Sequence, residues 1–184
     1  IVLANTVGAS AGADAFFVAF KIPNFLRRLF GEGAFAQAFV PVFTETREKE
    51  GDRSVKRLID QVAGRLGLIL IAISIIGVLL APWIAKLFAP GFSDDPEKLT
   101  LTADLLRWTF PYLGFICFVA FAGGILNSVG RFAIPAATPM LLNLSLIGSA
   151  LFLVPLMSPS VLGLAIGVAI AGMIQLVLQI PPLM

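Results

Sequence analysis

The sequence predicts an all-α protein, a polytopic bundle of transmembrane helices. Of its 184 residues, 58% are hydrophobic and 13% are charged, whereas a soluble domain carries about 25% charged residues. Its mean hydropathy is +0.96. Uncharged stretches of about 20 residues, the length that a helix needs to cross a bilayer, recur along the chain. We therefore expect residues 1–184 to form a single transmembrane helical domain.

Four uncharged stretches are long enough to be spanning helices. Residues 66–85 and 108–130 contain no charged side chain, and each could cross the hydrocarbon core. Beyond the last arginine the chain is uncharged, and its prolines and serines predict a short turn at residues 157–159. We place the last two spans at about 135–156 and 160–180.

Residues 13–44 are apolar but interrupted by charges and helix breakers. As one helix this segment would be about 46 Å long, which exceeds a hydrocarbon core of about 30 Å. It must therefore tilt, bend or break. Pro23 and the Gly31/Gly33 pair are the expected places, because proline removes a backbone donor and glycine weakens a helix.

Charged residues within this segment are the strongest functional signal in the sequence. Each costs about 2.5–3.5 kcal/mol at the centre of a spanning helix, so these side chains must pair or line a watery cavity. Asp14, Lys21 and Arg28 are seven residues apart and would share one face of an unbroken helix. Glu32 lies close to that face, while Arg27 lies about 100° from Arg28. Because charges recur on one face, we favour a polar cavity over simple ion pairs between helices, such as Lys21 with Glu32 or Asp14 with Lys21.

The charged segments between the spans predict the orientation of the helices. Residues 47–57 hold five basic side chains in a loop that should be cytoplasmic, and residues 89–104 hold four acidic ones in a loop that should be external. Trp83 and Trp108 flank the acidic loop, as aromatic residues at a membrane interface do. The pattern gives a truncated first helix at residues 1–8 and five spans. Because the chain opens within an apolar run, we expect an internal piece of a longer protein.

The sequence offers little for covalent or metal chemistry. It has no histidine and one cysteine, Cys117, which we interpret as a small buried hydrophobic residue. The acidic group Asp94, Asp95 and Glu97 could hold a divalent metal ion in a membrane-embedded phosphotransferase, but we favour a solvated loop. The sequence therefore predicts no catalytic residue, no metal and no cofactor.

Small and polar residues in the spans are expected to serve helix packing. Asn127, Asn143 and Ser145 are interpreted as interhelical hydrogen-bonding groups rather than ligands. The Gly163/Gly167 spacing predicts a place where two helices approach closely.

Two motifs resemble a known family of transporters. Residues 13–41 read ADAFFVAFKIPNFLRRLFGEGAFAQAFVP, which closely resembles the second-helix signature of the MurJ (MviN) family of lipid II flippases. This family belongs to the multidrug/oligosaccharidyl-lipid/polysaccharide exporter superfamily. Residues 127–147, NSVGRFAIPAATPMLLNLSLI, are similar to the family's junction between its fourth and fifth helices, and APWIAKLFAPGF from Ala81 also fits. The resemblance covers essentially the whole chain.

The resemblance implies a two-lobed membrane transporter and not an enzyme. Members translocate undecaprenyl-diphosphate-linked peptidoglycan precursor (lipid II) from the inner to the outer leaflet by alternating access, for cell-wall synthesis. We accordingly expect a multi-pass protein of the bacterial cytoplasmic (inner) membrane. Its expected partners are lipid II, membrane lipids and the cell-wall synthesis machinery, with no nucleic acid. The alternatives are a related exporter of drugs or of another polyprenyl-linked oligosaccharide, or a scaffold of the cell-wall machinery that transports nothing.

The resemblance also implies which residues line the substrate cavity. The matching motif positions are Asp14, Lys21, Asn24, Arg27 and Glu32. The motif favours Arg27, the first of the arginine pair, whereas the helical wheel favours Arg28. We side with the motif, since the wheel assumes an unbroken helix. Arg27, with Lys21 nearby, is expected to bind the diphosphate by charge-assisted hydrogen bonds, and Asp14 and Glu32 to tune the cavity charge or form gate pairs.

Departures from the family pattern are few. Gly31 stands where the family often has alanine, which would loosen the helix. On this resemblance the chain corresponds to most of the N-terminal lobe. The arginines of the family's first helix would then precede Ile1, and the C-terminal lobe would follow Met184.

Overall fold

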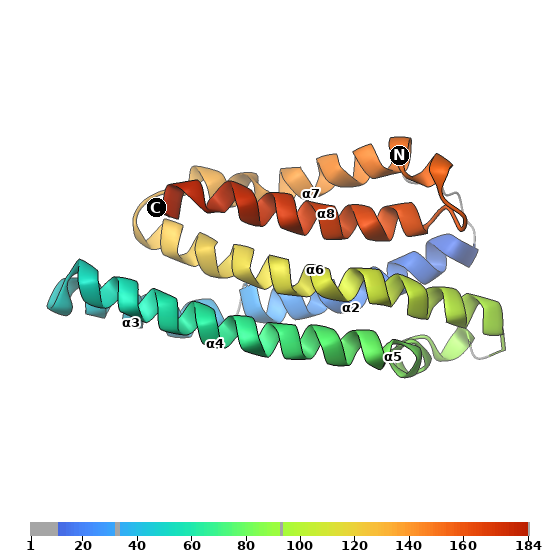
Figure 1. The fold of residues 1–184 in the computed structure, drawn as a ribbon, viewed down its shortest axis with the longest axis horizontal. Helices are drawn as coiled ribbons and strands as arrows, with labels where there is room; N and C mark the ends of the chain where they lie inside the picture. The colour runs from blue at the N-terminus through green and yellow to red at the C-terminus, as the bar shows by residue number, and fades with distance from the viewer. Residues whose placement is uncertain (1–10, 32–33, 93, 184) are drawn as a thin grey trace.

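The structure is a computed structural model that describes residues 11–31, 34–92 and 94–183. All of its regular elements are helical, and the long ones run side by side along one axis (Figure 1). In chain order they are α2 (Ala11–Gly31), α3 (Ala34–Glu50), α4 (Asp52–Leu79), α5 (Ala81–Phe88), the 3₁₀ turn η1 (Pro90–Phe92), α6 (Pro96–Ser128), α7 (Ala133–Phe152), η2 (Val154–Leu156), α8 (Leu162–Gln179) and η3 (Pro181–Leu183).

Four segments of the described chain are long and apolar enough to cross a membrane. They are Asp52–Leu79, Pro96–Ser128, Ala133–Leu156 and Leu162–Leu183. The prediction of a polytopic transmembrane helix bundle is thereby confirmed. Residues 13–44, expected as a further span, form α2 and α3 instead and are not among the four. Helix α2 carries four charged residues, and α3 has only 17 residues. The truncated helix predicted at residues 1–8 lies outside the described residues.

Helix α2 continues without interruption past Pro23, so the chain does not break at this expected place. A proline inside a helix leaves the carbonyl four residues earlier without its usual N–H donor. That carbonyl belongs to Ala19, and the hydroxyl of Thr109 on α6 donates to it across 3.3 Å. Because Thr109 is fully buried, α6 provides the hydrogen bond that Pro23 removes.

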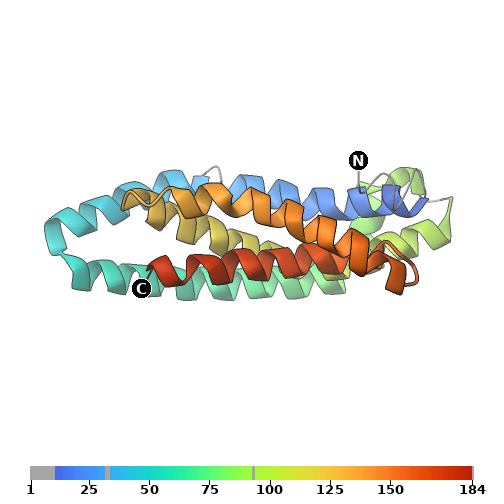
Figure 2. The ribbon, with the colours of Figure 1, turned by 90° about the horizontal axis from the view of Figure 1, so that it is seen from above.

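The other predicted break coincides with the junction of two helices. Helix α2 ends at Gly31, the first glycine of the predicted Gly31/Gly33 pair, and α3 begins at Ala34. Figure 2 shows α3 continuing along the same edge of the bundle as α2. The segment is therefore divided into two shorter helices that follow one another.

The basic segment at residues 47–57 is not a loop, which corrects the prediction. Helix α3 extends to Glu50 and α4 begins at Asp52, so Gly51 alone joins them. Gly51 has φ 78° and ψ −178°, a backbone conformation that is essentially restricted to glycine. The two helix ends project beyond the neighbouring helices (Figure 1), which keeps their charges outside the bundle.

The acidic segment at residues 89–104 is also largely structured, contrary to the loop prediction. Helix α6 begins at Pro96, a residue suited to the first turn of a helix. Asp95 caps it, because its Oδ1 accepts a hydrogen bond from the Lys98 N–H at 3.0 Å. At this end of the bundle Trp83 and Trp108 are both exposed.

Helix α6 forms the centre of the bundle. It packs against α2, α4, α5 and α8, while α7 packs mainly against α8. Its buried side chains contribute to two apolar clusters, one around Tyr112 and Leu106 and one that joins Cys117 and Phe121 to Phe39 of α3. Cys117 is 4% exposed, which confirms its role as a small buried hydrophobic residue.

Helices α7 and α8 approach closely where the glycine spacing predicts it. A Cβ on Gly163 would lie 2.8 Å from the backbone nitrogen of Val154, and one on Gly167 would lie 2.0 Å from Ser149 Oγ. Ser145 Oγ donates to the carbonyl of Gly167 at 3.1 Å, an interhelical bond as expected. Two asparagines differ, because their side chains are exposed and make no hydrogen bond with described residues; they are Asn127 and Asn143.

Candidate functional site

One face of α2 is exposed along its length and carries its described charges. Its exposed residues are separated by three or four positions, which matches the period of an α-helix. We call this surface the charged face of α2; its members are Asp14, Phe17, Lys21, Phe25 and Arg28. The opposite side of the helix is buried through residues such as Ala15, Ala19 and Ile22 and packs against α6. Asp14, Lys21 and Arg28 thus share one face, as the helical wheel predicts.

The continuity of α2 decides how its two arginines are arranged. The wheel applies to residues 14–28 because the helix does not break at Pro23. Arg28 is exposed on the charged face, and position 27 lies about 100° around the helix from it. The side chain of Arg27 lies outside the described residues, as does Glu32. Asn24, the remaining motif residue, is half-buried on α2.

The partner of Asp14 is a residue that the sequence reasoning did not select. Lys98 Nζ on α6 lies 2.9 Å from Asp14 Oδ2, so the alternative pairing of Asp14 with Lys21 does not occur. Seven residues along a helix span about 10 Å, too far for those two side chains to meet on α2. One feature of the sequence could have identified Lys98 as the partner of Asp14: it is the single base within the acidic segment at residues 89–104.

The electrostatics of the charged face favour an anion. Asp14 is neutralised by Lys98, while Lys21 has no ion-pair partner among the described acidic residues. Lys21 and Arg28 are two turns apart, with the exposed ring of Phe25 between them. Lysine and arginine bind phosphate groups by charge-assisted hydrogen bonds. The arrangement can therefore hold an anionic group that lies along the helix beside apolar surface.

The acidic group that might have held a metal ion is arranged as a helix start. Asp95 accepts the capping hydrogen bond from Lys98, and Asp94 and Glu97 are exposed. Across the described residues, no three His, Cys, Asp or Glu side chains lie close enough together to bind a metal ion.

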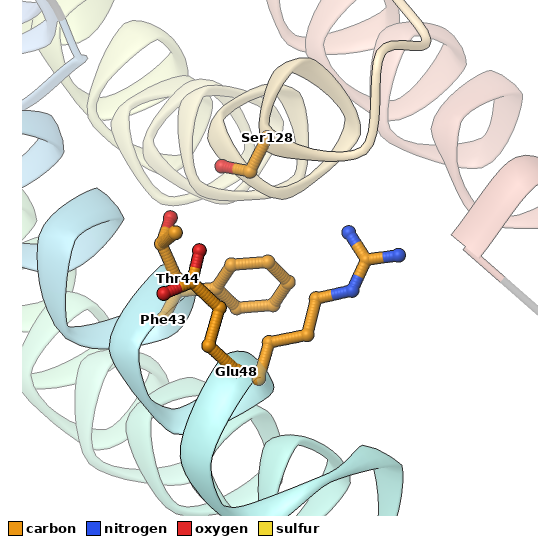
Figure 3. Close-up of a pocket in the computed structure, with 5 residues that line it drawn as sticks. Phe43, Thr44, Glu48 and Ser128 are labelled. Atoms are coloured by element: carbon orange, nitrogen blue, oxygen red, sulfur yellow. The ribbon is translucent and has the colours of Figure 1, made fainter.

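A second candidate is a cleft of about 400 Å³ between α3 and the end of α6 (Figure 3). Its lining residues are Phe43, Thr44, Arg47, Glu48 and Ser128. The hydroxyls of Thr44 and Ser128 each donate to a carbonyl of their own helix, at 3.0 and 2.7 Å. Arg47 and Glu48 are exposed and opposite in charge. The cleft therefore favours an anion less than the charged face of α2 does.

Comparison with known proteins shows the family that the chain resembles. The family model described as "Lipid II flippase MurJ" matches residues 3–184. A probable lipid II flippase MurJ from Haemophilus influenzae is 44% identical, with 98% of this chain and 37% of the relative aligned. A probable lipid II flippase MurJ from Vibrio cholerae is 45% identical, with 98% and 36% aligned.

A solved structure supports the same relationship. A chain described as "Lipid II flippase MurJ, inward closed conformation" matches with a TM-score of 0.84 at 30% sequence identity, over 98% of this chain and 37% of that one. The present chain thus spans between a third and two fifths of the length of these relatives.

Proposed function

The chain belongs to the lipid II flippase MurJ family, and on that premise we propose that it forms part of a flippase for lipid II. The transporter moves this undecaprenyl-diphosphate-linked peptidoglycan precursor from the inner to the outer leaflet by alternating access, for cell-wall synthesis. The observation that carries the proposal is the charged face of α2, where Lys21 and Arg28 stand exposed on a helix packed within a multi-pass membrane bundle.

The diphosphate of lipid II is the group that this face binds. Each cation would cost about 2.5–3.5 kcal/mol if it faced lipid at mid-membrane, so the face borders a hydrated cavity. Lys21 and Arg28 contact the diphosphate from positions two turns apart, and Arg27, the arginine that the family motif favours, contacts it from the adjoining ridge. Loss of one charge-assisted hydrogen bond costs roughly 1.5–3 kcal/mol, or about 10- to 100-fold in affinity.

The proposed function also gives the chain a location in the membrane and a place in the whole transporter. The protein lies in the bacterial cytoplasmic membrane, with residues 47–57 cytoplasmic and residues 89–104 external, and the projecting basic helix ends support this orientation. The chain acts as the N-terminal lobe, and a second lobe completes the cavity. Glu32 and Asp14 tune the cavity charge, or form pairs that exchange between the two conformations.

A related exporter of drugs or of another polyprenyl-linked oligosaccharide is the second candidate. A drug/cation antiporter would need acidic groups in its cavity, whereas Asp14, the acid among the described residues of this face, is already paired with Lys98. Another polyprenyl-diphosphate substrate shares the chemistry of lipid II up to its glycan. An enzymatic role is disfavoured, because a membrane phosphotransferase would need its carboxylates at the end opposite the acidic segment.

Complementation tests the proposal. Residues 3–184 replace the matching segment of the Vibrio cholerae relative, and this full-length chimera is expressed in cells depleted of their own lipid II flippase. We expect the chimera to restore growth and the single variants Lys21→Ala, Arg27→Ala and Arg28→Ala to fail or to grow slowly at matched membrane levels. Lys56→Ala, which removes a charge from the exposed start of α4, is the matched control and should grow normally.

The results distinguish an error in the proposed binding site from an error in the proposed function. If every α2 variant restores growth, the flippase proposal stands and the binding site must lie elsewhere. If a well-expressed chimera fails while the unaltered relative succeeds, the second candidate becomes the better explanation.

A further inference from the structure

Two glutamines of α8 are buried between the helices. Gln175 and Gln179 are four residues apart, so they lie on the same face of the helix, and each is 1% exposed. A side-chain amide carries a donor nitrogen and an acceptor oxygen, and burying either without a hydrogen-bond partner is unfavourable. The partners of both amides must therefore be found inside the bundle.

Both amides reach Thr138 of α7. Nε2 of Gln175 donates to the carbonyl of Thr138 at 2.7 Å, and Nε2 of Gln179 donates to Thr138 Oγ1 at 3.2 Å. A carbonyl only accepts, and the Thr138 hydroxyl already donates to the carbonyl of Ile134 at 3.3 Å. Both contacts thus require the nitrogen of the glutamine amide, and the amide oxygens are left for other partners.

The two amide oxygens are buried acceptors that need a neutral donor. Oε1 of Gln175 and Oε1 of Gln179 make no hydrogen bond with described residues, and their burial keeps any other part of the transporter from reaching them. Residues 132–184 contain no charged side chain, so a bound cation would bring an uncompensated charge into the bilayer. A neutral molecule with two hydrogens to donate fits the two oxygens.

Gly123 of α6 leaves room for such a molecule beside Gln179. A Cβ built on Gly123 lies 3.9 Å from Gln179 Nε2 and 3.5 Å from Pro135 Cβ, which are ordinary van der Waals distances. We propose that one water molecule binds between Gly123 and the two amides, and donates one hydrogen to Oε1 of Gln175 and the other to Oε1 of Gln179. Buried waters make about three hydrogen bonds, and the second hydrogen of a glutamine Nε2 provides the third.

The bound water joins three helices. Helix α6 provides the space, α7 fixes both amides through Thr138, and α8 provides the two acceptors. Gln179 is the last residue of α8, which ends at the same end of the bundle as α6 (Figure 1). The inference goes beyond the proposed function, because it depends on how the helices pack and not on the substrate that is carried.

Solid-state NMR of the full-length chimera in lipid bilayers tests the site. Glutamine side chains are labelled with ¹⁵N, and the transfer of magnetisation from water to each amide nitrogen is followed over time. Gln61 is exposed on α4 and gives the rate of a hydrated amide. Gln175→Met and Gln179→Met assign the two buried signals, because each variant removes one of them.

Both buried amides should receive magnetisation at a rate within about twofold of that of Gln61, because each contacts a bound water. Gly123→Ala places a methyl group in the position of the water and should slow both transfers several-fold. Gly124→Ala is the matched control, since no atom lies within 4 Å of its new Cβ, and it should leave both rates unchanged. Gln179→Met should slow the transfer to Gln175, because the water loses one of its two acceptors.

Three results would overturn the water site. The first is transfer to both buried glutamines that is several times slower than transfer to Gln61 in the parent chimera. The second is an unchanged rate in Gly123→Ala at parental protein level and parental midpoint of thermal unfolding. The third applies even if Gly123→Ala fails to fold: transfer to Gln175 that is unchanged in Gln179→Met excludes a shared water. A chimera that does not support growth can still be measured, so failure of the flippase proposal leaves this test intact.

Discussion

Replacing Thr109 with valine tests why α2 can continue past a proline. Valine keeps the shape of the side chain but removes the hydroxyl that donates to the carbonyl of Ala19. Pro23 has already removed the helical donor of that carbonyl, so the substitution leaves a buried acceptor unsatisfied, at a cost of about 1–3 kcal/mol. Thr109 Oγ1 lies 3.3 Å from the Ala19 oxygen and 3.4 Å from that of Leu106. Both distances are long for O–H···O bonds, so we expect the lower part of that range, about 1–2 kcal/mol.

Thr102→Val is the matched control. Thr102 is as buried as Thr109, and its hydroxyl donates at 2.8 Å to the carbonyl of Lys98 within the same helix. That carbonyl keeps its backbone donor in α6, so no acceptor is left without a partner. The control should therefore lose less than about 0.5 kcal/mol, half of the typical worth of a protein hydrogen bond.

A double-mutant cycle with Pro23→Ala tests whether Pro23 and Thr109 act on the same carbonyl, that of Ala19. Alanine restores an N–H at position 23, which can again donate to Ala19. The variant carrying both Pro23→Ala and Thr109→Val should be less destabilised than the sum of the single changes, with a coupling of about 1 kcal/mol. The midpoint of thermal unfolding of the full-length chimera in detergent measures each change, at about 1 °C per kcal/mol, because the entropy of unfolding grows with chain length and this segment is 36% of the relative. Equal effects of Thr109→Val and Thr102→Val, or strict additivity with Pro23→Ala, would refute the reasoning.

The same thermal measurement checks two further predictions. Gly167→Ala places a Cβ 2.0 Å from Ser149 Oγ and should destabilise the contact between α7 and α8 by about 1–3 kcal/mol. Gly148→Ala, with no atom within 4 Å of the new Cβ, should be neutral or slightly stabilising, and equal midpoints for the two variants would contradict the packing argument. Gly51→Ala should cost about 1–3 kcal/mol through its backbone conformation alone, since its φ is +78° and no atom lies within 4 Å. Gly91→Ala, equally open but without a positive φ, is its control, and the backbone explanation fails if the two lower the midpoint alike.

The ends of the helices do not coincide with the ends of the apolar stretches. Uncharged runs located the spans because they must match the hydrocarbon core, but they do not define where a helix ends. Residues 47–57 were predicted as a loop and are two helix ends, because Gly51 reverses the chain within one residue. Residues 89–104 contain the capped start of α6 at Pro96, three turns before the uncharged run begins. Helices continue into water wherever caps satisfy their terminal groups.

The helical class, the approximate spans and the shared face of Asp14, Lys21 and Arg28 were determined by the sequence itself. Each depends on composition or on a period along one helix, and such patterns are local. The partners across helices were decided by the tertiary structure. Asp14 meets Lys98 at a sequence separation of 84, and the carbonyl of Ala19 meets Thr109 at a separation of 90. Both contacts exist because α2 packs lengthwise against α6, and that packing brings together charges and polar groups that no spacing along the chain relates.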